Sequence, residues 1–118
     1  MCREELLTAI AKVRQVHVDD QIYDYIARLA EVTRTHPLLK LGISPRGALA
    51  LCRTAKARAF AEGRDFVVPE DVTQMAEYVF AHRLMLSSKA RLNEYTPEAI
   101  VAEVLAQTQP PVLSERRA

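Results

Sequence analysis

Residues 41–63 read LGISPRGALALCRTAKARAFAEG, and they contain the best-defined helix of this 118-residue sequence. Ser44 is a residue type that caps helix N-termini, and Pro45 suits the first helical position because a proline there loses no hydrogen bond. Apolar residues follow at helical spacing, and Gly63 is a typical C-terminal stop. The stretch therefore predicts one long helix that begins at Pro45 and ends before Gly63.

Apolar residues recur at helical spacing on both sides of this stretch as well. We expect helices over residues 4–16 and 19–34, another that begins at Pro69, and a last one over residues 97–107. Residues 66–68 are the one segment that we expect to be extended. The predicted fold class is therefore all-α: a small helical bundle with at most one short extended segment.

We expect the helical bundle to occupy residues 18–107. Residues 1–17 are predicted to form an N-terminal helix or linker, and residues 108–118, which contain two prolines and few apolar side chains, a flexible tail. A composition that is 49% hydrophobic and 26% charged suits a single globular domain.

The overall charge and the apolar runs limit the classes of partner. The formal net charge is +1, so no general basic field favours nucleic acid or an anionic membrane. The sequence shows neither a signal peptide nor an apolar run of membrane-spanning length. A cytoplasmic protein with no membrane partner is therefore the expectation, and nucleic-acid binding is disfavoured.

The sequence offers no pattern typical of a metal site. His17, His36 and His82 are widely separated, and neither C-x-x-C nor H-E-x-x-H occurs. We therefore predict no metal-binding residues.

Residues 42–47 have the G-x-x-x-x-G spacing of a phosphate loop but lack its chemistry. That motif continues with Lys and Ser or Thr, which reach the phosphates and the magnesium ion, whereas Ala48 and Leu49 follow here. Pro45 also removes one of the backbone N–H groups that such a loop would offer. No Walker B pattern occurs either. We therefore expect this chain to be inactive as an ATP hydrolase on its own.

Arg46 is the local feature that remains. It lies in the first turn of the predicted long helix, where the helix dipole disfavours a cation but favours an anion. Arg53 and Lys56 fall on nearly the same helix face, so a solvated basic stripe is the competing interpretation. Arg58, Arg64 and the other helix-borne charges are expected to form a mostly solvated face.

Several segments together resemble the C-terminal helical lid of MoxR-type AAA+ ATPases. Residues 41–46, LGISPR, are similar to an L-G-x-S-P-R stretch of that family, and residues 63–72, GRDFVVPEDV, to its G-R-x-[YF]-V-x-P-x-D-V stretch. Similar residues occur at 25–26, 33–34 and 82–84. The resemblance covers residues 16–105, with one departure, since Val68 stands where a capping Thr or Ser is expected.

The resemblance implies a role that the periodicity does not. Members of this family are chaperone-like remodelling machines that usually form hexameric rings. An αβ subdomain of the same protein binds ATP with magnesium, and the lid closes over the nucleotide. Arg46 resembles the sensor-2 arginine that reaches the γ-phosphate, and Ser44 belongs to the same nucleotide-facing motif. ATP and its magnesium would accordingly be bound only by the full-length protein.

Two other classes remain open from the sequence. Residues 68–72 followed by an amphipathic helix also occur in histone-fold-like domains that bind DNA, although the chain lacks the basic surplus typical of them. A helical protein-adaptor module is the second alternative, and it would need an exposed apolar patch.

Overall fold

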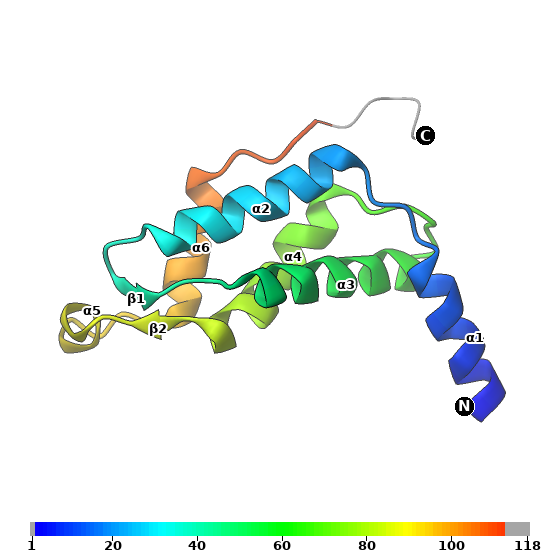
Figure 1. Ribbon diagram of the computed structural model, residues 1–118, viewed down its shortest axis with the longest axis horizontal. Helices are drawn as coiled ribbons and strands as arrows, with labels where there is room; N and C mark the ends of the chain where they lie inside the picture. The colour runs from blue at the N-terminus through cyan, green and yellow to red at the C-terminus, as the bar shows by residue number, and fades with distance from the viewer. Residues whose placement is uncertain (1, 113–118) are drawn as a thin grey trace.

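The computed structural model describes residues 2–112, and it confirms the predicted helical class. The elements, drawn in Figure 1, are α1 (Arg3–Arg14), α2 (Asp20–Arg34), β1 (Leu39–Leu41), α3 (Pro45–Ala61), α4 (Pro69–Phe80), the 3-10 turn η1 (Ala81–Arg83), β2 (Met85–Leu86), α5 (Ser88–Leu92) and α6 (Pro97–Gln107). The predicted flexible tail falls largely on residues 113–118, which lie outside the described residues.

Short polar caps determine where the main helices begin. The Ser44 side chain accepts the N–H of Gly47 at 3.2 Å, and the Thr96 side chain accepts the N–H of Ala99 at 3.1 Å. Asp19 does the same for α2, accepting from Gln21 at 2.9 Å. Prolines occupy the starts of α3, α4 and α6, where no intrahelical bond is lost.

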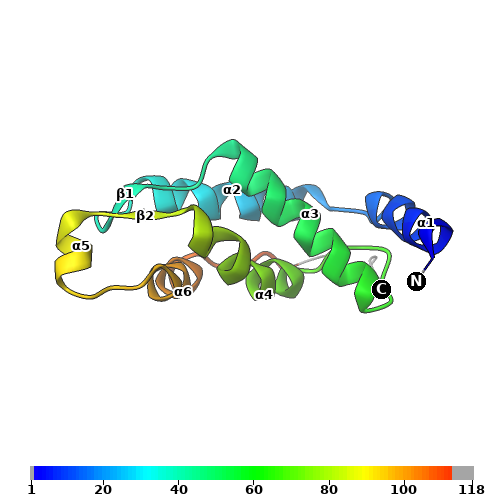
Figure 2. The same cartoon turned by 90° about the horizontal axis from the view of Figure 1, so that it is seen from below.

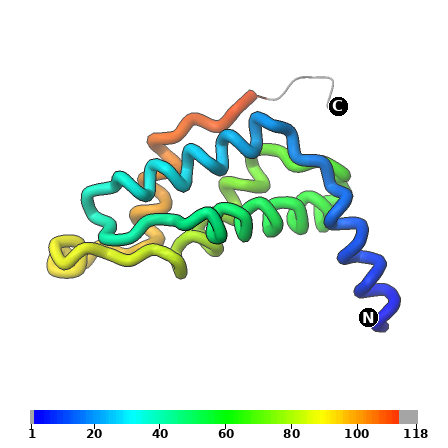
Figure 3. The backbone as a smooth tube through the Cα atoms, viewed as in Figure 1, coloured from blue at the N-terminus to red at the C-terminus, as the bar shows by residue number. Residues whose placement is uncertain are grey.

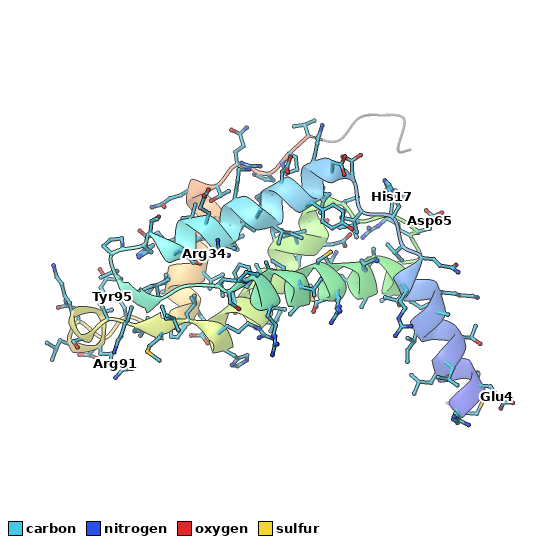
Figure 4. All side chains as sticks on the ribbon, viewed as in Figure 1. Glu4, His17, Arg34, Asp65, Arg91 and Tyr95 are labelled. Atoms are coloured by element: carbon cyan, nitrogen blue, oxygen red, sulfur yellow. The ribbon has the colours of Figure 1, made fainter. Side chains whose placement is uncertain are left out.

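Extended structure lies mainly where the sequence pattern did not indicate it. β1 and β2 pair antiparallel, with Leu39 opposite Leu86, and strands of three and two residues show no periodicity of their own. The expected extended segment contains one isolated bridge, from Phe66 to His17. His17 donates its N–H to the Asp65 carbonyl at 2.9 Å, and Figure 4 shows these two residues side by side.

The core lies between α2, α3, α4 and α6. Figure 2 shows α4 and α6 side by side below α2, with α3 running obliquely across them. The largest fully buried side chains of the core include Tyr25, Ile22, Phe80, Leu51 and Ile100. No helix in the described part of the chain is both long and apolar enough to cross a bilayer.

Helix α1 stands apart from this core. It projects from the bundle at the end opposite to β2 and α5, as Figures 1 and 3 show, and none of its residues is buried. Its apolar side chains Leu6, Leu7 and Ile10 remain 49%, 51% and 40% exposed. The apolar stripe expected for this helix is present, but within the described chain only part of it packs against α3.

A buried carboxylate joins α3 to α4 and corrects one expectation. Asp71 is fully buried, and its oxygens accept from Arg58 at 2.6 Å and from Arg64 at 2.7 Å through two N–H groups. The expectation that Arg58 and Arg64 lie on a solvated face was wrong, because both turn inward to this carboxylate and remain only about a quarter exposed.

Asp71 also solves the problem of a helix start that lacks a polar cap. Val68 precedes α4 and has no side-chain acceptor, but Asp71, three residues on, accepts the Val68 N–H at 2.8 Å. Burial alone would raise the pKa of Asp71. The hydrogen bonds from Arg64, the Val68 N–H and Arg58 outweigh burial and hold the pKa below its ordinary value of 3.8.

Replacing this carboxylate should destabilise the fold strongly. We expect Asp71→Asn to lower the free energy of unfolding by about 2–4 kcal/mol, because two partly buried arginines lose their counter-charge. Urea unfolding followed by circular dichroism measures the change. Glu70→Gln removes an exposed acid from the same helical turn and should cost no more than about 0.5 kcal/mol. Equal stabilities for the two variants would contradict the role of Asp71.

The same carboxylate should make the fold sensitive to acid. A carboxyl group whose pKa is lower in the folded state stabilises the fold above its unfolded pKa, and that stabilisation is lost as the pH falls through the folded value. The stability gap between the parent chain and Asp71→Asn should therefore be full at pH 7 and shrink below about pH 4. Urea titrations at pH 7, 5 and 3 test this, and a gap independent of pH would refute it.

Candidate functional site

The site expected from the sequence lies at the start of α3. Arg46 is the second residue of this helix, and its side chain is exposed and forms no hydrogen bond or ion pair within residues 2–112. Ser44 immediately before the helix is exposed as well and acts as the cap. A cation beside the positive end of a helix dipole is a combination that attracts anions.

The C-terminal end of α2 holds this helix start in place. Ile43 is fully buried, and both of its backbone polar groups bond to α2: its N–H donates to the Thr33 hydroxyl at 2.9 Å, and its carbonyl accepts from the Arg34 side chain at 2.8 Å. Thr33 in turn donates to the Ala30 carbonyl at 2.5 Å. Figure 4 shows Arg34 between α2 and the segment that leads into α3.

Gly42 permits the close approach that these bonds require. A Cβ atom at this position would lie 2.7 Å from the backbone of Thr33 and of Arg34, which is closer than real Cβ atoms come to other atoms. Any side chain at position 42 would therefore push α3 away from α2. The glycine of the 41–46 stretch thus allows the segment that leads to Arg46 to lie against the end of α2.

A second arginine approaches the same turn. A Cβ atom on Gly47 would lie 3.1 Å from Cδ of Arg83, so the Arg83 side chain lies against Gly47 in the first turn of α3. Sequence reasoning assigned no role to Arg83 or to Arg34. Their only signal was that both fall within segments of the family resemblance, residues 82–84 and 33–34, and nothing local indicates that these segments meet at residue 43 or 47.

Arg53 and Lys56 lie away from this site. Together with Arg14 they line a groove between α1 and the C-terminal half of α3. Lys56 donates to the carbonyl of Arg14 at 3.0 Å, which ties the end of α1 to α3. The basic residues of α3 therefore belong to three places: Arg46 to the helix start, Arg53 and Lys56 to the groove beside α1, and Arg58 to the ion pairs of Asp71.

Neighbouring groups of the chain contact both ring nitrogens of His36. His36 is buried, accepts the Leu38 N–H at its Nδ1 atom at 3.1 Å, and faces Glu103 at 3.2 Å through its Nε2 atom. Residues 2–112 contain no group of three or more His, Cys, Asp or Glu side chains that could hold a metal ion.

The chain is similar to known proteins over most of its length. The family described as the AAA lid domain matches residues 31–104. The uncharacterised protein YeaC of Bacillus subtilis is 37% identical over 95% of this chain, and the chaperone MoxR1 of Mycobacterium tuberculosis is 33% identical over 75% of it. The matched regions are 35% of YeaC and 26% of MoxR1, so this chain corresponds to about a third or less of each relative.

A solved structure extends the likeness to three dimensions. The crystal structure of an ATPase candidate from Cytophaga hutchinsonii superposes with a TM-score of 0.82 at 27% identity. The match covers 86% of this chain and 34% of that protein. The helical bundle, the family match over residues 31–104 and the MoxR relatives agree with one another. The chain therefore belongs to the AAA lid domain family, as a lid of the MoxR-type AAA+ ATPases.

Proposed function

We propose that this chain closes over the ATP bound by an αβ ATPase subdomain of the same protein, with Arg46 as the sensor-2 arginine. The observation that carries the proposal is the geometry of the start of α3. Arg46 is exposed and without a partner in the described chain, while the turn that bears it is held by Ser44, Thr33 and Arg34. A fixed backbone with a free cation is what binding an external anion requires.

The chemistry of such a contact follows from charge. Phosphoryl transfer builds negative charge on the oxygens of the γ-phosphate, and a positioned arginine stabilises that charge. Ser44 accepts a hydrogen bond from Gly47, and a hydroxyl that accepts can donate its own proton as well. In this proposal Ser44 therefore supports the helix start and can also donate to a phosphate oxygen. ATP and magnesium would be held mainly by the αβ subdomain.

The wider setting follows from the relatives. MoxR1 is named as a chaperone, and this chain corresponds to a quarter of its length. We propose that the intact protein likewise remodels client proteins in the cytoplasm, as a hexameric ring, and that this lid couples nucleotide state to movement. The histone-fold-like alternative is not favoured, because the family match and the net charge of +1 both point away from DNA.

The role of Arg46 can be tested in an intact polypeptide that contains this lid and its ATPase subdomain. Arg46→Ala should lower the rate of ATP turnover on the order of 10³-fold, because one cation that stabilises phosphoryl transfer is lost. Its stability should change by no more than about 0.5 kcal/mol, since the side chain is exposed. Phosphate release and urea unfolding measure the two effects.

Arg91→Ala is the matched control for this experiment. Arg91 is also an exposed arginine near a helix terminus, but it lies on α5 at the far tip of the molecule, as Figure 4 shows. It should leave turnover unchanged. If Arg46→Ala hydrolyses ATP at the parent rate with the same nucleotide affinity, the sensor assignment is wrong.

A second prediction concerns the chain by itself. The 118-residue chain should not hydrolyse ATP, because residues 42–47 are followed by Ala48 and Leu49 instead of the Lys and Ser or Thr of a phosphate loop. Phosphate release should equal that of a buffer control, measured on material free of other ATPases. Sustained phosphate release that copurifies with the chain would contradict the prediction.

A further inference from the structure

Helix α1 presents an apolar face that the described chain does not cover. Leu6 and Ile10 are 49% and 40% exposed, although they lie one turn apart on the side that faces α3. An isolated helix of about 12 residues is only marginally stable in water, so such a helix normally depends on packing. Helix α1 is attached to α3 at its C-terminal end, and the rest of its apolar face is free to pack on something else.

The space beside this face is a groove with apolar walls. Leu6, Ile10 and Val13 from α1 form one wall, and Ala57 and Phe60 from α3 form the other. The groove is therefore shaped by two helices at an angle to each other, which is a geometry that accepts a third helix or a ridge of apolar side chains.

The rim of the groove has one sign of charge. Its charged lining residues are Arg14, Arg53 and Lys56, and no acidic residue is among the described residues that line it. Glu4 and Glu5 line an adjoining hollow on the other side of Ala9 and Phe60, two residues that it shares with the groove. An apolar floor with a cationic rim is complementary to an apolar surface flanked by carboxylates.

We propose that this groove is where the lid rests on its own αβ ATPase subdomain, against an apolar and acidic face of it, whether or not nucleotide is bound. The inference rests on the proposed function. Relatives of this chain are about three times as long, so in a protein of their kind the lid is covalently joined to a much larger part of the same polypeptide. A part that is covalently linked has a high effective concentration, which favours it over any free partner for a surface of this size.

The groove and Arg46 would then divide the work of the lid between two ends of α3. Ala57 in the groove lies 11 residues from Arg46, or about 16 Å along a helix that rises 1.5 Å per residue. The groove end would stay covered and act as the pivot about which the lid moves, and the Arg46 end would make its contact only when a γ-phosphate is present. Helix α3 would act as a rigid arm between the two.

Cysteine labelling distinguishes a covered groove from an open one. In a Cys2→Ser background, Ala57→Cys places a thiol in the groove, and Gln107→Cys places one on the exposed end of α6. The rates of reaction with an uncharged maleimide are compared between this 118-residue chain and the intact protein, with and without ATP. The 118-residue chain serves as the open reference because its described residues already form a hydrophobic core of their own.

The expected result is protection at one position only. The thiol at position 57 should react about tenfold or more slowly in the intact protein, both with and without ATP, because a covered thiol reacts only when the contact opens. The thiol at position 107 should react at similar rates in both. Equal rates at position 57, or protection only with ATP, would overturn the inference. So would protection that appears only as protein concentration rises, because a second copy would then cover the groove.

Charge reversal tests the chemistry of the covering face. Arg53→Glu in the intact protein should restore most of the labelling at position 57, whereas Arg91→Glu, the same change outside the groove, should not. If the thiol at position 57 stays fully protected in Arg53→Glu, the face that covers the groove is not acidic and that part of the inference is wrong.

The labelling also separates this inference from the sensor assignment. Arg46→Ala should leave protection at position 57 intact while it lowers ATP turnover. If turnover falls but position 57 is never protected, the groove inference alone fails. If position 57 is protected but Arg46→Ala has normal turnover, the sensor assignment alone fails.

Discussion

The ion pairs of Asp71 are the interaction on which the rest of the structure depends. One fully buried carboxylate accepts from Arg58 on α3, from Arg64 in the following link and from the Val68 N–H before α4. An unpaired charge at this depth would be very costly, so the three donors and the carboxylate fold into place together or not at all. These bonds hold the link between α3 and α4, the two helices that pack most extensively against each other in the described chain.

The opposite end of α3 is held by different chemistry. Two hydrogen bonds attach it to α2: the Ile43 N–H donates to the Thr33 hydroxyl, and the Arg34 guanidinium donates to the Ile43 carbonyl. Gly42 allows the two backbones to meet. With an ion-paired end and a hydrogen-bonded end, α3 is joined to the bundle at both ends. Both proposed sites, Arg46 and the groove at Arg53, lie on this one fixed helix.

Helix starts could be predicted from the sequence because their causes are local. A capping Ser or Thr followed by a proline identified the beginnings of α3 and α6, and Pro69 without such a cap identified that of α4, in each case without knowledge of any other element. The same local view led to the wrong expectation for Arg58 and Arg64. Asp71 is an ordinary first-turn acid until α3 and α4 are placed side by side.

The candidate site shows the same division. The position of Arg46 at a helix start followed from Ser44 and Pro45, and its assignment followed from the family resemblance. What holds that helix start came only from the structure, because Thr33 lies ten residues before Ile43 and Arg83 lies 36 residues after Gly47. The stripe on α1 predicted a helix, but an apolar stripe does not reveal which surface will cover it.

A fixed α3 matters because the energy available from a single nucleotide contact is small. A hydrogen bond to a charged group contributes about 1.5–3 kcal/mol, which is roughly a ten- to hundredfold bias between an open and a closed lid. Ordering the backbone of even one flexible residue costs about 1–2 kcal/mol, so a loose helix start would cancel most of that bias. In the proposed mechanism, the bonds at Ile43 and Asp71 have already ordered the backbone of α3 when the lid folds. The free energy of the contact between Arg46 and a phosphate can then move the whole lid instead of ordering one turn of it.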